Sequence, residues 1–199
     1  DVESRGLGDV YKRQVYYMYI RHDAAAYARH LGVRMGEGCQ VLTDPQIAFG
    51  TEPWLIKLGN HVDVTLGVQF LNHEGGIWCA RGIDPEYNKL DCFAPTVVGN
   101  NVMIGVHSLI MPGVHIGNNV IIAGHCVVTK DIPDGAVVAG VPAKQISTVD
   151  KFMEGMKNRE LVPTKHMSAH EKKKYLEKLH PEWLSLIHIS EPTRLDVIS

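Results

Sequence analysis

Cysteine is scarce in this sequence, and long hydrophobic runs and a large excess of one charge sign are absent. The four cysteines include no CxxC pair, which argues against a zinc ribbon or a secreted disulfide framework and favours a reducing compartment. A formal net charge of −2 gives no indication of a surface for nucleic acid or an anionic membrane. No apolar run approaches the roughly 18 residues of a membrane span, and no signal-peptide pattern opens the chain. We therefore expect a cytoplasmic protein that neither spans a membrane nor binds nucleic acid.

The composition that remains is ordinary for one globular domain with small appendages. Of the 199 residues, 45% are apolar and 21% are charged. The two ends differ from this pattern, because residues 4–14 resemble the translation of a sequencing-library adapter and residues 184–194 resemble that of its reverse complement. We expect 1–14 and 184–199 to be adapter-derived and leave them out of the fold prediction. A pair of native, disordered tails is the alternative.

Short helices are expected on both sides of the central domain. In the N-terminal segment 15–32, Asp23 and Gly32 are placed to begin and end a helix of good helix formers. In the C-terminal segment 150–183, the letters SAHE that begin at Ser168 fit a capping box. The lysines that follow are those of a solvated helix face.

Aliphatic residues recur every six positions in the middle of the chain. The repeated positions are Val98, Ile104, Ile110, Ile116, Ile122 and Val128. A small or β-branched residue stands two places before each, and Gly, Asn and Pro lie between. A period of six is neither the 3.6 of a helix nor the 2 of a plain strand; it fits a short strand followed by a tight turn. Three such strands make a triangular coil, so the sequence predicts stacked coils over 33–149.

The repeat is weaker and interrupted nearer the N-terminus. One further set of aliphatic or aromatic residues keeps the six-residue spacing, namely Leu58, Val64 and Phe70. Another set follows the pattern only loosely, namely Met35, Val41 and Ile47. The phase is lost at 49–54 and again at 72–95. The second gap is longer than the roughly 12–15 residues expected of a structureless connection, and long ordered loops are usually functional.

Three segments together resemble the hexapeptide acyltransferase superfamily. They are the repeat itself, the letters VVTKDIP of 127–133 and the letters AGVPAK of 139–144. The letters FLNHEGGIW of 70–78 are similar to a subgroup thought to acetylate sugars of surface polysaccharides. Over about 17–150 the resemblance implies an all-β fold, a left-handed parallel β-helix with short terminal helices. It also implies a homotrimer, with acyl-CoA and a saccharide acceptor meeting between adjacent subunits.

The resemblance places a catalytic histidine at the start of the long loop. Acyl transfer to a hydroxyl needs a base, and an imidazole, whose ordinary pKa is about 6.5, suits that task at neutral pH. We expect His73 to be this base, Glu74 to orient it, and Asn72 and Trp78 to contact the acceptor. Backbone N–H groups at the coil corners would stabilise the oxyanion during direct transfer. The alternatives are an exposed histidine beside an exposed glutamate, an Asn72 that only shapes the loop, and a Trp78 buried beneath it.

The resemblance also implies a binding wall for acetyl-CoA. The residues expected to form it are Met103, Val106, His107, Ala123, Gly124, Lys130, Gly140, Pro142, Ala143 and Lys144. Lys130 and Lys144 would contact phosphates, and small residues would let the pantetheine arm pass close to the backbone. Met103 stands where many family members have tryptophan. Singly, the glycines and the proline are also explained by turns.

Three histidines on neighbouring repeats raise the question of a metal. Gamma-class carbonic anhydrases hold zinc with three histidines on this kind of fold. Here His107 and His125 stand three places after an aliphatic position, whereas His115 directly precedes one. The phase therefore does not bring the three together, and we expect no metal site.

These observations predict an enzyme, an acetyl-CoA-dependent O-acetyltransferase that acts on a sugar hydroxyl of a polysaccharide precursor. An N-acetyltransferase of an amino sugar, a catalytically silent trimeric scaffold and a metal-dependent lyase or hydrolase are the alternatives.

Overall fold

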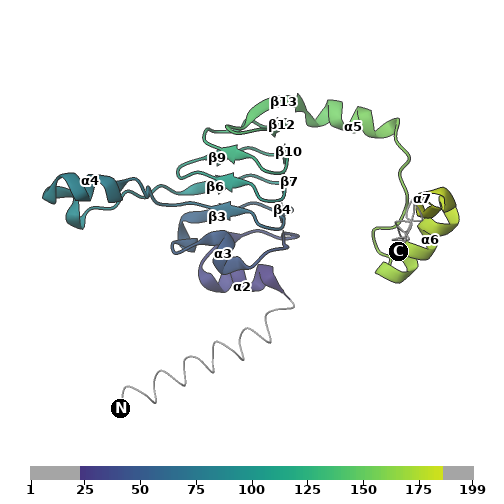
Figure 1. Ribbon diagram of the computed structural model, residues 1–199, viewed down its shortest axis with the longest axis horizontal. Helices are drawn as coiled ribbons and strands as arrows, with labels where there is room; N and C mark the ends of the chain where they lie inside the picture. The colour runs from purple at the N-terminus through teal and green to yellow at the C-terminus, as the bar shows by residue number, and fades with distance from the viewer. Residues whose placement is uncertain (1–22, 186–199) are drawn as a thin grey trace, which may run out of the picture. The chain divides into compact units, whose positions relative to one another are not determined.

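The structure is a computed structural model that describes residues 23–185 (Figure 1). The chain divides into two compact units, a coil domain up to Gly155 and a C-terminal unit from Met156. Of the segments expected to be adapter-derived, 1–14 lies outside the described residues, and only Leu184 and Ser185 of the other lie inside.

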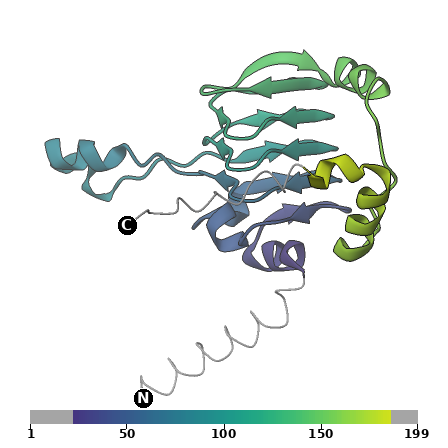
Figure 2. The ribbon, with the colours of Figure 1, turned by 45° about the vertical axis from the view of Figure 1, so that its right-hand side comes forward.

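Three sheets of short strands, parallel except for the last strand of the second sheet, form the coil domain (Figures 1 and 2). Sheet A contains β1 (Arg34–Met35), β3 (Ile56–Leu58), β6 (Thr96–Val98) and β9 (His115–Ile116). Sheet B contains β2 (Gln40–Val41), β4 (Val62–Val64), β7 (Val102–Ile104), β10 (Val120–Ile122), β12 (Ala136–Ala139) and β13 (Lys144–Thr148). Sheet C contains β5 (Gln69–Phe70), β8 (Leu109–Ile110) and β11 (Val127–Val128).

Consecutive strands visit the three sheets in turn, which makes the domain a parallel β-helix. Strand β6 lies in sheet A, β7 in sheet B and β8 in sheet C, and β9 then returns to pair with β6. Val97 lies beside His115 and Leu109 beside Val127, so one coil takes three hexapeptides. The predicted coils are confirmed. We name the corners A–B, B–C and C–A by the sheets that the chain leaves and enters.

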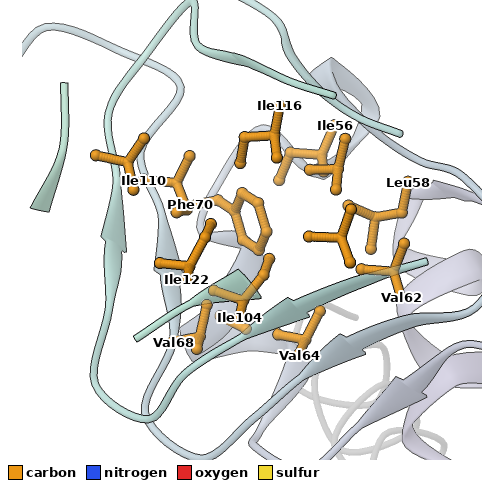
Figure 3. Packing of buried hydrophobic residues seen from close by; sticks show 14 of the residues in the cluster. Ile56, Leu58, Val62, Val64, Val68, Phe70, Ile104, Ile110, Ile116 and Ile122 are labelled. Atoms are coloured by element: carbon orange, nitrogen blue, oxygen red, sulfur yellow. The ribbon is translucent and has the colours of Figure 1, made fainter. Parts of the chain in front are cut away.

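The predicted aliphatic positions fill the interior of the coils. Each of the six positions of the regular repeat is at most 1% exposed, and Leu58, Val64 and Phe70 are at most 2% exposed (Figure 3). Burying one such side chain contributes about 1.5–3 kcal/mol to folding. The regular six-residue spacing thus stabilises one continuous core through the stack.

Asparagine side chains tie successive coils together at the A–B corner. The backbone N–H of Asn60 donates to Oδ1 of Asn100 (2.8 Å), that of Asn100 to Asn118 (2.9 Å) and that of Asn118 to Asp134 (2.7 Å). Hydrogen bonds from the backbone and the side chain of Asn118 hold the pKa of Asp134 below its usual value. Each bond satisfies a backbone donor that the turn would otherwise leave free.

The prediction made from the weak repeat at the N-terminal end is only partly right. Met35 and Val41 lie on strands, but Ile47 lies on helix α3 (Pro45–Phe49) and is 59% exposed. The Asp44 carboxylate caps this helix by accepting from the N–H of Gln46 at 2.8 Å, and proline occupies its first turn, so a helix forms in place of a third strand.

The expected terminal helices are confirmed, and further helices are present. Helix α2 (Ala24–Leu31) begins at Asp23, whose carboxylate accepts from Ala26 N at 2.9 Å, and ends at a left-handed Gly32. In the C-terminal unit, α6 (Ala169–Leu179) starts with the capping box at Ser168. Helices α4 (Ile77–Ile83), α5 (Val149–Lys157) and α7 (Pro181–Ser185) and the short η1 (Pro53–Leu55) and η2 (Pro85–Lys89) complete the described elements.

The prediction of an all-β fold is therefore too narrow. The described chain has sizeable helical content, and its three sheets are separate rather than closed on one another. Strand β13 also departs from the repeat, because it pairs antiparallel with β12 and ends the stack. No helix within 23–185 is long and apolar enough to cross a membrane.

Candidate active site

The segment 72–95 leaves the coil domain at the C–A corner as an ordered arm. It carries α4 and η2 and projects from the stack at the level of β3 and β6 (Figures 1 and 2). At its base, His73 bridges Phe93 in antiparallel fashion, and the N–H of Glu74 donates to the carbonyl of Cys92 at 2.9 Å. These backbone contacts fix His73 at the point where the arm meets the coils.

His73 is hydrogen-bonded to a carboxylate from a distant part of the chain. Its Nδ1 lies 2.9 Å from Oε2 of Glu52, which immediately precedes η1. The side chain of His73 is 46% exposed and that of Glu52 only 16%. Because a carboxylate accepts, Nδ1 is the protonated nitrogen and Nε2 is left as an acceptor. The pair is therefore arranged for a proton to be taken up at Nε2.

The surroundings of Glu52 favour its ionised form. Partial burial by itself raises the pKa of Glu52, but hydrogen bonds from His73 and Thr51, together with the charge of protonated His73, outweigh burial. The net result is a pKa below the usual value. An ionised Glu52 would stabilise the imidazolium that forms when His73 accepts a proton.

In the structure the carboxylate hydrogen-bonded to His73 is that of Glu52, whereas the sequence prediction named Glu74 for this contact. The Glu74 carboxylate instead accepts from the N–H of Gly76 at 2.9 Å, within the first turn of the arm. Glu52 was missed because it is far from His73 in sequence. The available signal was the loss of repeat phase at 49–54, in which Glu52 lies.

The predicted acceptor residues lie at the base and on the outer part of the arm. Asn72 is 2% exposed, and its buried Oδ1 has no hydrogen-bond partner among the described residues. Trp78, on α4, is 79% exposed and so is not buried beneath the arm. The Phe93 ring is steeply inclined to the His73 imidazole, at an interplanar angle of 75° with centroids 6.3 Å apart, and Phe93 is 51% exposed.

Four of the ten predicted cofactor residues lie at the B–C corner. Val106 and His107 follow β7, and Ala123 and Gly124 follow β10 one coil further on. The rings of His107 and His125 stack at 5.2 Å. A Cβ on Gly124 would lie 3.2 Å from a methyl of Val106, so the missing side chain opens space over that residue. Met103 lies on the outward face of sheet B and is 40% exposed.

Four further predicted cofactor residues, Gly140, Pro142, Ala143 and Lys144, lie at the end of the stack. The carbonyl of Gly140 accepts from Val127 N at 3.2 Å, and the N–H of Ala143 donates to Val127 O at 2.8 Å. The turn through Pro142 therefore extends sheet C beyond β11, and exposed Lys144 begins β13.

Lys130 lies on a different corner from the four predicted cofactor residues of the B–C corner. It follows β11 at the C–A corner, two coils along from the position where His73 follows β5. Two coil spacings correspond to about 10 Å along the stack. The structure thus divides the predicted donor contacts between two edges of the triangular coil.

The three histidines considered for zinc do not meet. His115 points outward from β9 of sheet A, whereas His107 and His125 stack at the B–C corner. Among residues 23–185, no group of three or more His, Cys, Asp or Glu side chains is placed to hold a metal ion.

The stack of hexapeptide coils defines a hexapeptide-repeat protein, and a histidine–carboxylate pair lies at the base of its arm. The family model described as bacterial transferase hexapeptide (six repeats) matches residues 95–130. The chain is 44% identical over 149 residues to Protein CapG of Staphylococcus aureus, which covers 74% of this chain and 84% of that protein. The chain belongs to the hexapeptide-repeat acyltransferase superfamily.

Other similarities are more limited. A 2,3,4,5-tetrahydropyridine-2,6-dicarboxylate N-acetyltransferase of Staphylococcus aureus (strain JH9) is 39% identical over 64 residues, which are 32% of this chain and 27% of that protein. Among solved structures, a hexapeptide-repeat acetyltransferase from Vibrio cholerae matches with a TM-score of 0.46 and 21% identity, over 64% of this chain and 81% of that one. A maltose O-acetyltransferase from Clostridium difficile 630 matches with a TM-score of 0.39 and 24% identity, over 61% and 72%.

Proposed function

We propose that the protein transfers an acetyl group from acetyl-CoA to a sugar hydroxyl, on a cytoplasmic precursor of a surface polysaccharide. The observation that carries the proposal is the hydrogen-bonded pair of His73 and Glu52 at the base of the arm, in a member of an acyltransferase superfamily. The pair leaves Nε2 of a partly exposed imidazole ready to accept a hydroxyl proton.

The proposed reaction is a direct transfer in two proton movements. As the acceptor oxygen attacks the thioester carbonyl, His73 Nε2 takes the hydroxyl proton and Glu52 stabilises the resulting imidazolium. The tetrahedral oxyanion collapses, the C–S bond breaks, and the imidazolium returns the proton to the CoA sulfur. The products are the acetyl ester and CoA, and the histidine is regenerated. Backbone N–H groups at a coil corner would stabilise the oxyanion.

Donor binding is proposed to involve both edges of the coil, in a left-handed β-helix that assembles as a homotrimer. Lys130 and Lys144 would contact the CoA phosphates, and the small residues of the B–C corner would lie against the pantetheine arm. Lys130 and the B–C corner lie on different edges of one chain, with sheet C between them. A donor that contacts both edges therefore fits best between two subunits, one supplying His73 and the other the B–C corner.

The test is acetyl transfer from acetyl-CoA to a panel of sugars and nucleotide sugars, comparing wild type with His73→Ala. Loss of the base should lower turnover by about 10²- to 10⁴-fold. His61→Ala is the matched control, because His61 is an exposed corner histidine on the same coil. Undiminished turnover in His73→Ala would remove His73 as the base.

Amino sugars belong in the same panel. The 64-residue similarity to an N-acetyltransferase makes an amine the second candidate acceptor. Amide rather than ester products would select it. Absence of any acyl-CoA binding by calorimetry, with an intact assembly, would instead select the silent scaffold.

A further inference from the structure

Two like charges face each other on sheet A without a partner. Arg34 on β1 and Lys57 on β3 are register partners on adjacent parallel strands, so their side chains leave the same outward face about 4.8 Å apart. Both residues are exposed, and within 23–185 neither side chain makes an ion pair or a hydrogen bond. Like charges directly opposite each other destabilise a sheet. A bound anion would remove this repulsion.

A third cation and an aromatic ring adjoin the pair. The Arg29 guanidinium donates to the carbonyls of Met35 and Gly36 at the end of β1, and no described carboxylate pairs with it. Trp54 is 58% exposed and lies beside the turn that enters β1, because a Cβ on Gly32 would be 3.5 Å from its Cβ. An indole with an exposed face is suited to stack on a nucleobase.

This face lies next to the candidate active site, away from the proposed donor phosphates. Glu52 precedes η1, which carries Trp54 and leads directly into β3 and Lys57. Lys130 follows β11, at the opposite end of the stack from β1. A donor that runs from His73 toward Lys130 leaves Arg34 and Lys57 on the acceptor side of the histidine.

We propose that Arg34, Lys57 and Trp54 bind the nucleoside diphosphate of an activated sugar, so that the acceptor is a nucleotide sugar rather than a free sugar. The two cations bridge the diphosphate, and the indole stacks on the base. The sugar then extends toward Nε2 of His73. The assignment to an acceptor rests on the proposed function, whereas the anion site itself rests only on the geometry of sheet A.

CoA also contains a nucleoside diphosphate, so the test separates the two sources. Dissociation constants of the full chain are measured by calorimetry for UDP, for inorganic pyrophosphate and for CoA. The variants are Arg34→Ala/Lys57→Ala and Trp54→Leu. Lys173→Ala/Lys174→Ala on α6 is the control with the same change in charge.

The double variant should bind UDP and pyrophosphate about 10- to 100-fold more weakly than wild type. Its dissociation constant for CoA should be unchanged. Trp54→Leu should weaken the binding of UDP but not of pyrophosphate. The lysine control should leave all three dissociation constants unchanged. Because the two cations repel each other, the double variant should unfold at no lower temperature than wild type.

Four results would overturn the proposal. They are a wild type that binds neither UDP nor pyrophosphate, a double variant that binds both as wild type does, a loss of CoA binding in the double variant, or a change in its oligomeric state. A loss of CoA binding would assign the face to the donor, and a change in oligomeric state would assign it to an interface between copies.

Two further outcomes separate the anion site from the proposed function. If the binding pattern holds but no acceptor is acetylated, the proposed function fails and the anion site stands. If a free sugar is acetylated equally well by the double variant and wild type, the acceptor assignment fails and the proposed function stands.

Discussion

At the scale of residues, the candidate site depends on a contact between distant parts of the chain. Glu52 and His73 are 21 positions apart, yet their side chains are hydrogen-bonded. The contact is possible because η1 begins just after Glu52 while the arm begins just before His73, and both lie where coils enter sheet A. A substitution of Glu52 by glutamine removes the negative charge of this contact and keeps its hydrogen bond.

We predict that Glu52→Gln lowers kcat by about 10- to 100-fold, because a neutral amide still accepts from Nδ1 but no longer stabilises the imidazolium. The acceptor KM should change little. Steady-state kinetics on the best sugar of the panel measure both. Glu74→Gln is the matched control and should keep nearly full activity, since that carboxylate bonds Gly76. A larger loss in Glu74→Gln than in Glu52→Gln would reverse the assignment.

We predict that Glu52 also contributes to stability in a pH-dependent way. Its pKa in the folded protein is lowered, so the contribution is fully present above the unfolded value of about 4.3 and is lost as the pH falls through the folded value. Wild type should therefore be more stable than Glu52→Gln at pH 7, and the difference should shrink below about pH 4. Urea unfolding at the two pH values measures this. A constant difference would mean that the charge of Glu52 is not responsible.

At the scale of elements, the coils are held at a fixed spacing by glycines that pack on the next backbone. At the A–B corner, a Cβ on Gly99 would lie 2.6 Å from the carbonyl oxygen of Gly117, closer than side chains tolerate. Gly82, on α4 of the arm, has nothing within 4 Å of the same position. The same substitution therefore has opposite consequences at the two sites.

We predict that Gly99→Ala destabilises the protein by about 1–3 kcal/mol, because the added methyl group forces two coils apart. Gly82→Ala should leave stability unchanged or raise it by up to about 1 kcal/mol, because alanine is the better helix former. Urea denaturation of both variants measures the free energies of unfolding. Equal effects would show that close coil packing does not explain the glycine at position 99.

The strands were predictable from the sequence because inward-facing aliphatics recur in phase with the coil. Ile104, Ile110, Ile116 and Ile122 are fully buried as the spacing requires. Ile47 has the right spacing but lies on a helix, because the local Asp44–Pro45 start outweighs a single aliphatic position. The antiparallel return of β13 has no signal in a period of six.

The site was predictable only where a residue lies beside the break in the repeat. His73 and Asn72 stand at such a break, and the structure places both at the base of the arm. The pairing of Glu52 with His73 is a tertiary contact, and a periodic pattern contains no information about which residues of neighbouring coils meet. The sequence likewise groups Lys130 with Val106, whereas the structure places them on different edges.

At the scale of the whole molecule, the residues proposed for the site lie on two different edges of the coil domain, and this has a consequence for how subunits assemble. His73 and Lys130 lie at the C–A corner and Val106 at the B–C corner, with the width of sheet C between them. A single chain therefore carries the proposed base on one edge and the proposed small-residue wall on the other. In the proposed trimer, a site combines the first edge of one subunit with the second edge of its neighbour.

We predict that two inactive variants restore activity when combined in one trimer. His73→Ala lacks the base, and Val106→Trp blocks the donor wall at an exposed position. In randomly mixed trimers, a site works when its base comes from the Val106→Trp chain and its wall from the His73→Ala chain, so equal mixing should give about one quarter of wild-type activity. Co-expression with two tags, followed by acetyl-transfer assay and mass measurement of the purified assembly, tests this. If base and wall belonged to the same chain, every site would carry one defect, and the mixed trimers would be as inactive as either parent.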